Sequence, residues 1–193
     1  MSEPFTGRRR LASLDALFAP RSIAIVGASQ DARKIGGRPL AFLKRYGYPG
    51  AVYPVNPQYA EVQGVPAFSS LGACPAVPDQ VIVALPAPKV PAVVAEAAAI
   101  GAKTAVVFSS GFAEAGEEGK ALQQRLVGVI GDGPLRVLGP NCIGVMNVPA
   151  RSYGTFQVAL ESGTAPAGGV GVAVQSGAMG SHLLTLARNA GIG

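Results

Sequence analysis

The sequence is built around short apolar runs that end abruptly at residues which break regular structure. Each run is rich in Val, Ile, Leu or Ala and gives way within a few residues to Gly, Pro, Ser or Asn. The runs cover residues 22–26, 51–55, 80–85, 104–108, 135–138 and 169–174. Short apolar runs bounded by turn residues are typical of strands buried on both faces of a sheet. With 49% hydrophobic residues, the chain is not intrinsically disordered.

Segments of helical character lie between these runs. We expect helices over residues 37–46, 90–100 and 114–130, and a further helix over residues 179–189. Alternating strands and helices are typical of the doubly wound α/β class, a parallel sheet with helices on both faces. Pro54 in the second run predicts an edge strand or a bulge, because proline cannot donate to a strand ladder.

The alternation stops after the fifth strand and begins again near residue 168. We therefore expect a Rossmann-like domain over residues 1–147, an irregular linker over 148–167, and the first strand and helix of a second domain over 168–193. Without its sheet, this last unit would expose an apolar face made of Val170, Val172, Val174, Leu183 and Leu186. We expect it to pack on the first domain, to pair with another chain, or to be disordered.

Composition narrows the partners and the compartment. The net charge of +5 is compatible with an anionic ligand, but no stacking aromatics or recognition motif accompany the basic residues, so we expect no nucleic-acid partner. Cys74 and Cys142 are too few for a disulfide framework and have no metal-ligand spacing. We expect a reduced, cytoplasmic protein without a metal.

Two stretches could be mistaken for membrane or targeting segments. The cluster Arg8-Arg9-Arg10 is followed by no apolar run, as a signal peptide would require. The uncharged residues 162–187 contain several Gly, Pro166 and Gln175, which disfavour a lipid-exposed helix. We expect no contact with a membrane.

Ligands of a doubly wound sheet bind beyond the carboxyl ends of its strands, and the loop after the first strand carries the strongest signal there. Gly27 allows a sharp turn, and Gly36 and Gly37 open the following helix, whose N-terminal N–H groups and dipole favour an anion. Three cations surround that helix start: Arg33, Lys34 and Arg38. The pattern predicts a phosphate site; the alternative is a plain turn that uses glycine for its geometry alone.

The spacing of these glycines does not favour a nicotinamide dinucleotide. That fingerprint needs G-x-G-x-x-G and an acid at the end of the second strand for the ribose hydroxyls. Here Gly27 is followed by Gly36 and Gly37, and the second strand runs into Asn56 and Pro57. A phosphorylated nucleotide without that ribose contact fits better.

Six motifs occur in order along the chain. They are Gly27-Ala28-Ser29, Tyr53-Pro54-Val55-Asn56-Pro57, Leu85-Pro86-Ala87, Ser109-Ser110-Gly111-Phe112, Gly139-Pro140-Asn141-Cys142-Ile143-Gly144 and Gln175-Ser176-Gly177-Ala178. In this series, over roughly residues 11–193, the chain resembles the NDP-forming acyl-CoA synthetases of the ADP-forming acetate–CoA ligase type, which are related to the succinyl-CoA synthetase α subunit. The resemblance implies a coenzyme A-binding first domain, followed by the start of a flavodoxin-like, succinyl-CoA-ligase-like domain.

The resemblance also implies which residues hold coenzyme A. The nucleotide phosphates would lie at Gly27, Ala28, Ser29, Gln30, Lys34, Gly36 and Gly37. The adenine-side groove would be lined by Asn56 and Pro57, and the pantetheine would pass Pro86, Ser109, Ser110 and Gly111.

The chain departs from the family pattern at one point in this site. Relatives commonly carry a Lys after Asn-Pro, where this chain has Gln58 and Tyr59. A phosphate contact is therefore lost, or is supplied instead by Arg33, Lys34 or Arg38.

In this family a carboxylate, coenzyme A and ATP give acyl-CoA, ADP and phosphate through an acyl phosphate and a phosphorylated histidine. Ser176, Gly177 and Ala178 resemble the helix N-terminus that cradles that histidine. The histidine lies further along the second domain, and the nucleotide site lies in an ATP-grasp part, so the resemblance implies that this chain alone is inactive. His182 does not match the phosphorylated position, and we expect it to be a packed or surface residue.

No residue of the chain is expected to be catalytic. Cys142 has no neighbouring cation or histidine to lower its pKa, so we expect a buried structural thiol. Ser109 and Ser110 have no general base in view, so their hydroxyls are expected to bind ligand rather than to attack it. Asn141 is expected to hydrogen-bond the loop that ends the fifth strand.

Three functions remain open on the sequence. The first is a fragment or subunit of an acid–thiol ligase, with the remaining synthetase domains or an ATP-grasp subunit as partners. The second is a stand-alone module that binds coenzyme A or an acyl-CoA without catalysis, and a homo-oligomer is compatible with either. The third is a Rossmann NAD(P)-binding protein, which the fold alone favours.

Overall fold

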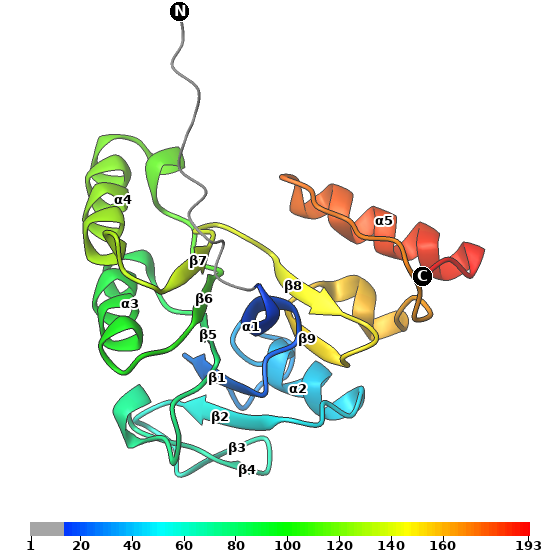
Figure 1. Cartoon of the computed structure of the whole chain (residues 1–193), viewed down its shortest axis with the longest axis horizontal. Coiled ribbons are helices and arrows are strands. Elements are labelled where there is room, and N and C mark those ends of the chain that lie inside the picture. The colour runs from blue at the N-terminus through cyan, green and yellow to red at the C-terminus, as the bar shows by residue number, and fades with distance from the viewer. Residues whose placement is uncertain (1–13) are drawn as a thin grey trace, which may run out of the picture.

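The computed structural model describes residues 14–193; residues 1–13, with the cluster Arg8-Arg9-Arg10, lie outside the described residues. Within the described part, a parallel sheet of five strands has the order β2-β1-β5-β6-β7 (Figure 1). Its strands are β1 (Ser22–Val26), β2 (Ala51–Val55), β5 (Gln80–Val83), β6 (Thr104–Val107) and β7 (Arg136–Leu138). The predicted doubly wound, Rossmann-like class is confirmed, and β2, which carries Pro54, lies at the predicted edge.

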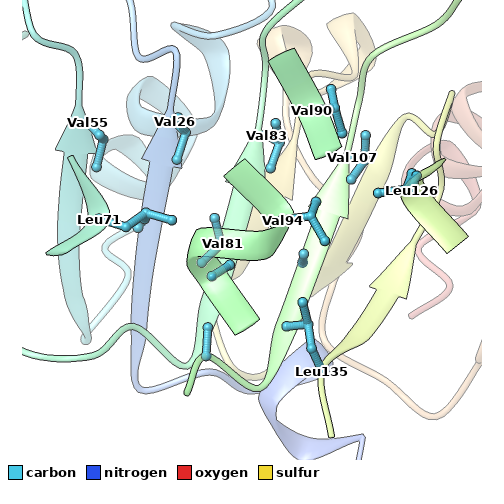
Figure 2. Packing of buried hydrophobic residues seen from close by; sticks show 14 of the residues in the cluster. Val26, Val55, Leu71, Val81, Val83, Val90, Val94, Val107, Leu126 and Leu135 are labelled. Carbon is cyan, nitrogen blue, oxygen red and sulfur yellow. The ribbon is translucent and has the colours of Figure 1, made fainter. Parts of the chain in front are cut away.

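The central strands are buried on both faces, as their unbroken apolar runs predict. Ile23, Ile25 and Ile82 face one side of the sheet, whereas Val81 and Val83 face the other. Figure 2 shows Val81, Val83 and Val107 beside Val90, Val94 and Leu126, which belong to two helices on that second face.

Helices cover one face of the sheet, and a mixed layer covers the other. The face of Val81 and Val83 packs against α3 (Val90–Ala99) and α4 (Glu117–Ile130). The face of Ile23, Ile25 and Ile82 packs against α2 (Arg38–Arg45) and a β-hairpin, with α1 (Asp15–Phe18) beside them (Figure 1). The helix expected from residue 114 begins instead at Glu117, after η3 (Ala113–Ala115), because Gly116 has a φ of +95° that a helix cannot accommodate. Two short 3₁₀ turns, η1 (Leu71–Ala73) and η2 (Ala87–Lys89), flank β5.

The expectation of an irregular linker over residues 148–167 is wrong. β8 (Gly144–Asn147) pairs antiparallel with β9 (Ser152–Thr155), and η4 (Val158–Ser162) follows. β9 is fully buried, and its Tyr153 packs on Tyr46, the C-cap residue of α2, with ring centroids 4.5 Å apart. The Tyr46 hydroxyl donates to the carbonyl of Leu160 at 2.5 Å, so this segment packs against the end of α2.

The strand expected over residues 169–174 is also wrong. These residues form no strand and are exposed; Val170 and Val172 keep 63% and 60% of their surface in contact with solvent. A strand needs a neighbour for its N–H and C=O groups, and no strand of the described residues lies beside this segment. α5 (Gly177–Ala190) does form, and Figure 1 shows it outside the sheet and helix layers, resting on η4 through the buried Leu184.

A small hairpin follows β2. It consists of β3 (Glu61–Val62) and β4 (Val65–Pro66). Phe68 forms an isolated bridge with Val55, which fixes the hairpin to the edge strand. No helix within residues 14–193 is long and apolar enough to cross a membrane, and the cytoplasmic location stays a prediction.

The amino ends of the strands are held by buried polar groups. The Asp79 carboxylate, which precedes β5, accepts hydrogen bonds from the backbone and side chain of Arg21 and lies 2.8 Å from Lys103 Nζ. These bonds, those from Arg21 above all, lower the pKa of Asp79 below its usual range. Gln80 and Thr104 donate to the carbonyl of Ala16 and thereby fix α1 to the same edge. Sequence analysis did not single out this cluster.

Replacing Asp79 by Ala should lower the free energy of unfolding by roughly 1–3 kcal/mol, because charge-assisted hydrogen bonds to a buried carboxylate are lost. The folded-state pKa is depressed, so this stability is present above the unfolded pKa of about 3.9 and is lost as the pH falls below it. Urea denaturation at neutral and acidic pH measures both effects. Glu118→Ala, at an exposed position on α4, is the control; equal losses for the two variants would contradict the assignment.

Candidate functional site

The loops that carry the predicted site residues gather at the carboxyl ends of the parallel strands. The chain leaves β1 for the edge strand β2 and returns to β5 on the other side of β1, so the order of strands reverses between β1 and β5. Such a reversal leaves a crevice between the two loops that follow the strands. Gly27, after β1, lies there beside the residues that follow β5, and Ala84 N–H donates to Val26.

The glycines of the β1–α2 loop are required by the fold itself. Gly27 has a φ of +86°, and a Cβ on it would lie 2.5 Å from the Ala84 carbonyl oxygen. Gly36 packs against the Gly27 carbonyl, and Gly37 packs against that of Asp31, each too closely for any side chain. A bulky residue at Gly27 would therefore collide with Ala84, just after β5, which makes Gly27 substitutions unsuitable tests of ligand contact.

The start of α2 has fewer open N–H groups than the sequence suggests. Gly37 and Arg38 both donate to the Lys34 carbonyl at 2.9 Å, and Pro39 has no N–H. By contrast, no group within residues 14–193 accepts a hydrogen bond from the amides of three loop residues: Gln30, Ala32 and Ile35. The donors available to an anion lie in the loop rather than at the helix end.

Two of the three predicted cations are already paired. Arg33 binds Asp31 at 3.1 Å, and hydrogen bonds from Arg33 lower the pKa of Asp31 to about 2. Arg38, with 17% of its side chain exposed, binds Glu161 of η4 at 3.1 Å. Lys34 is exposed and has no ion-pair partner within residues 14–193, so it remains the cation available at this loop.

Asn56 connects the loop after β2 to the loop after β1. Its Nδ2 donates to the Ala28 carbonyl at 2.8 Å, and its Oδ1 accepts from the Gln58 amide at 3.0 Å. Asn56 and Pro57 line an open depression of about 480 Å³, whose other walls include Tyr59 and Phe68. The depression therefore lies directly beside the β1–α2 loop.

The loops after β5, β6 and β7 are joined in the same way. Ser109 donates its hydroxyl to the Leu85 carbonyl at 2.5 Å, and the backbone amide of Asn141 donates to the Ser109 carbonyl at 2.9 Å. This bond of Asn141 reaches the loop after β6, whereas a bond to the loop after β7 was expected. Pro86 and Ser110 are exposed beside them, and the Gly111 amide donates to Glu114. No base contacts either serine hydroxyl within the described residues, so the arrangement suits binding rather than nucleophilic attack.

The thiols and the histidine also lack catalytic settings. The Cys142 thiol donates to the Val107 carbonyl, 3.2 Å away, and burial raises its pKa, as expected for a structural thiol. His182 lies exposed on α5 and is a surface residue. Within residues 14–193, no three His, Cys, Asp or Glu side chains gather as a metal site would need.

The last predicted group lies at the start of α5. Ser176 caps this helix by accepting a hydrogen bond from the Met179 amide at 3.3 Å, and Gly177 lies against Ile143, just after the β7 loop. Ala178 is exposed. The structure thus brings this helix start close to the loops of the first domain.

Sequence analysis missed Gln63, at the tip of the β3–β4 hairpin. Its side-chain Nε2 donates to the carbonyls of Ser29 and Gly37, at the two ends of the β1–α2 loop. A Gln-Gly pair between Val62 and Val65 is a turn signal that could have located the hairpin tip, but no local pattern predicts the contacts of its side chain.

Comparison with known proteins identifies a family and similar proteins of known name. The family model for the CoA binding domain matches residues 21–148. Over 171 residues the chain is 39% identical to the Acetate–CoA ligase [ADP-forming] II subunit alpha of Pyrococcus furiosus, covering 89% of this chain and 36% of the relative.

Solved structures agree with the sequence comparison. A crystal structure of a Pyrococcus horikoshii OT3 protein has a TM-score of 0.85 and 36% identity, covering 94% of this chain and 40% of that one. The apo form of the dinucleotide forming Acetyl-coenzyme A synthetase 1 of Ca. Korarchaeum cryptofilum has a TM-score of 0.79 and 36% identity, covering 94% and 38%. The chain thus spans about two fifths of the length of these proteins or less.

Both cysteines should react slowly with thiol reagents in the native protein. Burial, with Glu96 nearby, raises the pKa of Cys74 to about 11, so its thiolate fraction at pH 8 is roughly 100-fold below that of an ordinary cysteine. Burial also raises the pKa of Cys142. Reaction with a chromogenic disulfide before and after denaturation measures this. Rapid labelling of Cys142 in the native protein would contradict the structural assignment.

Proposed function

Because this chain belongs to the CoA binding domain family, we propose that it is the coenzyme A-binding portion of an ADP-forming acyl-CoA synthetase. The observation that carries the proposal is identity of 36–39% over about nine tenths of the chain, with a sheet whose strand order reverses beneath the predicted loops. The relatives are named as acetate–CoA ligase and acetyl-coenzyme A synthetase. The ligand is coenzyme A or its acyl thioester.

In the proposed binding mode, coenzyme A extends over three groups of loops: the β1–α2 loop, the loop after β2, and the loops after β5 and β6. The phosphates lie at the β1–α2 loop, where the amides of Gln30, Ala32 and Ile35 and the ammonium of Lys34 are available. Backbone N–H groups and a single exposed cation are a suitable combination for a phosphate. Lys34 thereby supplies the charge that Gln58 and Tyr59 do not.

The remaining parts of coenzyme A occupy the neighbouring surface. The adenine lies in the depression beside Asn56 and Pro57, which has the aromatic rings of Tyr59 and Phe68 in its walls. The pantetheine then crosses Pro86 and the loop of Ser109, Ser110 and Gly111. Ser109 and Asn141 hold these loops together, which supports a preformed path.

An NAD(P) role is the weaker candidate. A nicotinamide dinucleotide site needs an acid at the end of β2 to bind the ribose hydroxyls. Asn56 stands there, and its amide is committed to the Ala28 carbonyl. The structure therefore lacks the contact that would distinguish an NAD site from a coenzyme A site.

A part in a larger synthetase also fits better than a stand-alone module. Residues 168–193 are proposed to be the start of a second domain, whose remaining part would cover the exposed side chains of Val170, Val172 and Val174. Ser176, Gly177 and Ala178 would cradle a phosphorylated histidine from that domain. The other synthetase domains, or an ATP-grasp subunit, are the proposed partners for converting a carboxylate, coenzyme A and ATP to acyl-CoA, ADP and phosphate.

The 193-residue chain should bind coenzyme A in calorimetry, and Lys34→Ala should weaken this binding roughly three- to tenfold, because one exposed phosphate contact is lost. Added salt should weaken the wild type more than the variant, since the variant has one cation fewer at the phosphates. Arg125→Ala, which removes an exposed cation from α4, should leave the affinity unchanged. Absence of binding by the folded wild-type chain would refute the proposal.

The same chain should form no acyl-CoA from acetate, coenzyme A and ATP. The reason is that His182 is its one histidine, lies exposed on α5, and does not match the position of the family's phosphorylated histidine. Coupled detection of ADP together with chromatography of the thioester measures this. Turnover above that of a heat-inactivated sample would overturn the assignment of the chain as a binding portion.

A further inference from the structure

The tip of the β3–β4 hairpin has an unusual backbone. Gln63 has a φ of +52° and Gly64 a φ of +79°, so both residues of the two-residue turn are left-handed. This is the type I′ geometry, in which glycine, asparagine and aspartate are preferred. A glutamine there bears backbone strain that a glycine would relieve, so its side chain must contribute something that favours the observed arrangement.

The contacts of Gln63 identify that contribution. Its Nε2 donates to the Ser29 carbonyl at 2.8 Å and to the Gly37 carbonyl at 3.0 Å. Ser29 stands near the start of the β1–α2 loop and Gly37 at its end, so one amide group bridges the two ends of the loop. The left-handed backbone directs this side chain away from the hairpin and across the loop.

The hairpin and the loop are bound together by further hydrogen bonds. The Gln63 amide donates to Gln30 Oε1 at 2.8 Å, and Gln30 Nε2 donates to the Glu61 carbonyl at 2.6 Å. From α2, Lys44 Nζ donates to the Gln63 carbonyl. Every hydrogen-bonding group of Gln63 except its own Oε1 thus has a partner in or beside the loop.

The base of the same hairpin reaches the neighbouring depression. The Ala67 amide donates to the Ala60 carbonyl at 2.9 Å, and both residues line the depression beside Asn56. A single short element therefore contributes walls to the depression and holds the adjacent loop at its tip. The two parts of the surface cannot move independently while these hydrogen bonds persist.

We propose that Gln63 is a positioning residue, which holds the β1–α2 loop in the shape that receives the phosphate end of the ligand and couples that loop to the depression for the adenine. This inference rests on the proposed coenzyme A function. Gln63 acts through the loop; the loop amides and Lys34 make the contacts with phosphate. Without the bridge, the loop would sample several shapes, and the ligand would have to order it on binding.

Two variants test the bridge in different ways. Gln63→Glu is nearly isosteric but replaces the donating amide by an oxygen that faces two carbonyls. Gln63→Gly removes the side chain and relieves the left-handed strain, so the thermal stability of that variant should be retained. Gln124→Ala, at an exposed position on α4, is the matched control.

Calorimetry with coenzyme A should show at least a tenfold loss of affinity for both Gln63 variants and none for the control. Hydrogen exchange should become faster in residues 28–38 of Gln63→Gly but not in Gln80–Val83 of β5, a pattern that general destabilisation would not give. Wild-type affinity in both variants, or faster exchange in both segments alike, would overturn the inference. If the wild-type chain does not bind coenzyme A, the proposed function fails, and the exchange pattern alone decides whether Gln63 holds the loop.

Discussion

The fold and the candidate site both depend on one close approach of backbone to backbone. Gly27, Gly36 and Ala84 meet where the chain order reverses between β1 and β5, with too little space for a side chain on either glycine. This contact closes the β1–α2 loop onto the sheet and sets the direction in which α2 leaves it. The turn that these glycines permit leaves the amides of Gln30, Ala32 and Ile35 without acceptors in the described part of the chain, so the packing requirement shapes the loop that has the capacity for an anion.

The amino and carboxyl ends of the parallel strands, called here the amino edge and the carboxyl edge, differ in how their polar groups are used. At the amino edge, Asp79, Gln80 and Thr104 are buried and bind groups of the protein itself. At the carboxyl edge, hydrogen bonds from side chains to backbone connect each loop to the next, as Asn56 and Ser109 illustrate. These contacts fix the loops while leaving other donors for a ligand. The buried polar side chains of the sheet thus lie at the ends of the strands opposite the candidate site.

Local patterns were sufficient where structure depends on local residues. The apolar runs located the parallel strands, and Pro54 located the sheet edge, because burial and the missing N–H act at those positions directly. Contacts between residues that are distant in the sequence could not be predicted from local patterns. Tyr153 lies in a polar segment and is buried only because Tyr46 and Leu160 surround it, and Gln63 became notable only once Ser29 and Gly37 were placed beside it. For residues 169–174 the prediction of a strand failed for the opposite reason. The local sequence favours a strand, but no described strand pairs with this segment.

The hairpin β8–β9 and η4 give the C-terminal unit a physical connection to the β1–α2 loop. On one side, Arg188 of α5 donates to the Ala159 carbonyl of η4. On the other, Glu161 of η4 pairs with Arg38, the first residue of α2, whose amide closes the loop at Lys34. A displacement of α5 would therefore reach the end of the loop through the side chains of Arg188, Glu161 and Arg38 and one short turn. If this unit belongs to a second domain, docking of that domain and the shape of the β1–α2 loop depend on the same ion pair, between Arg38 and Glu161.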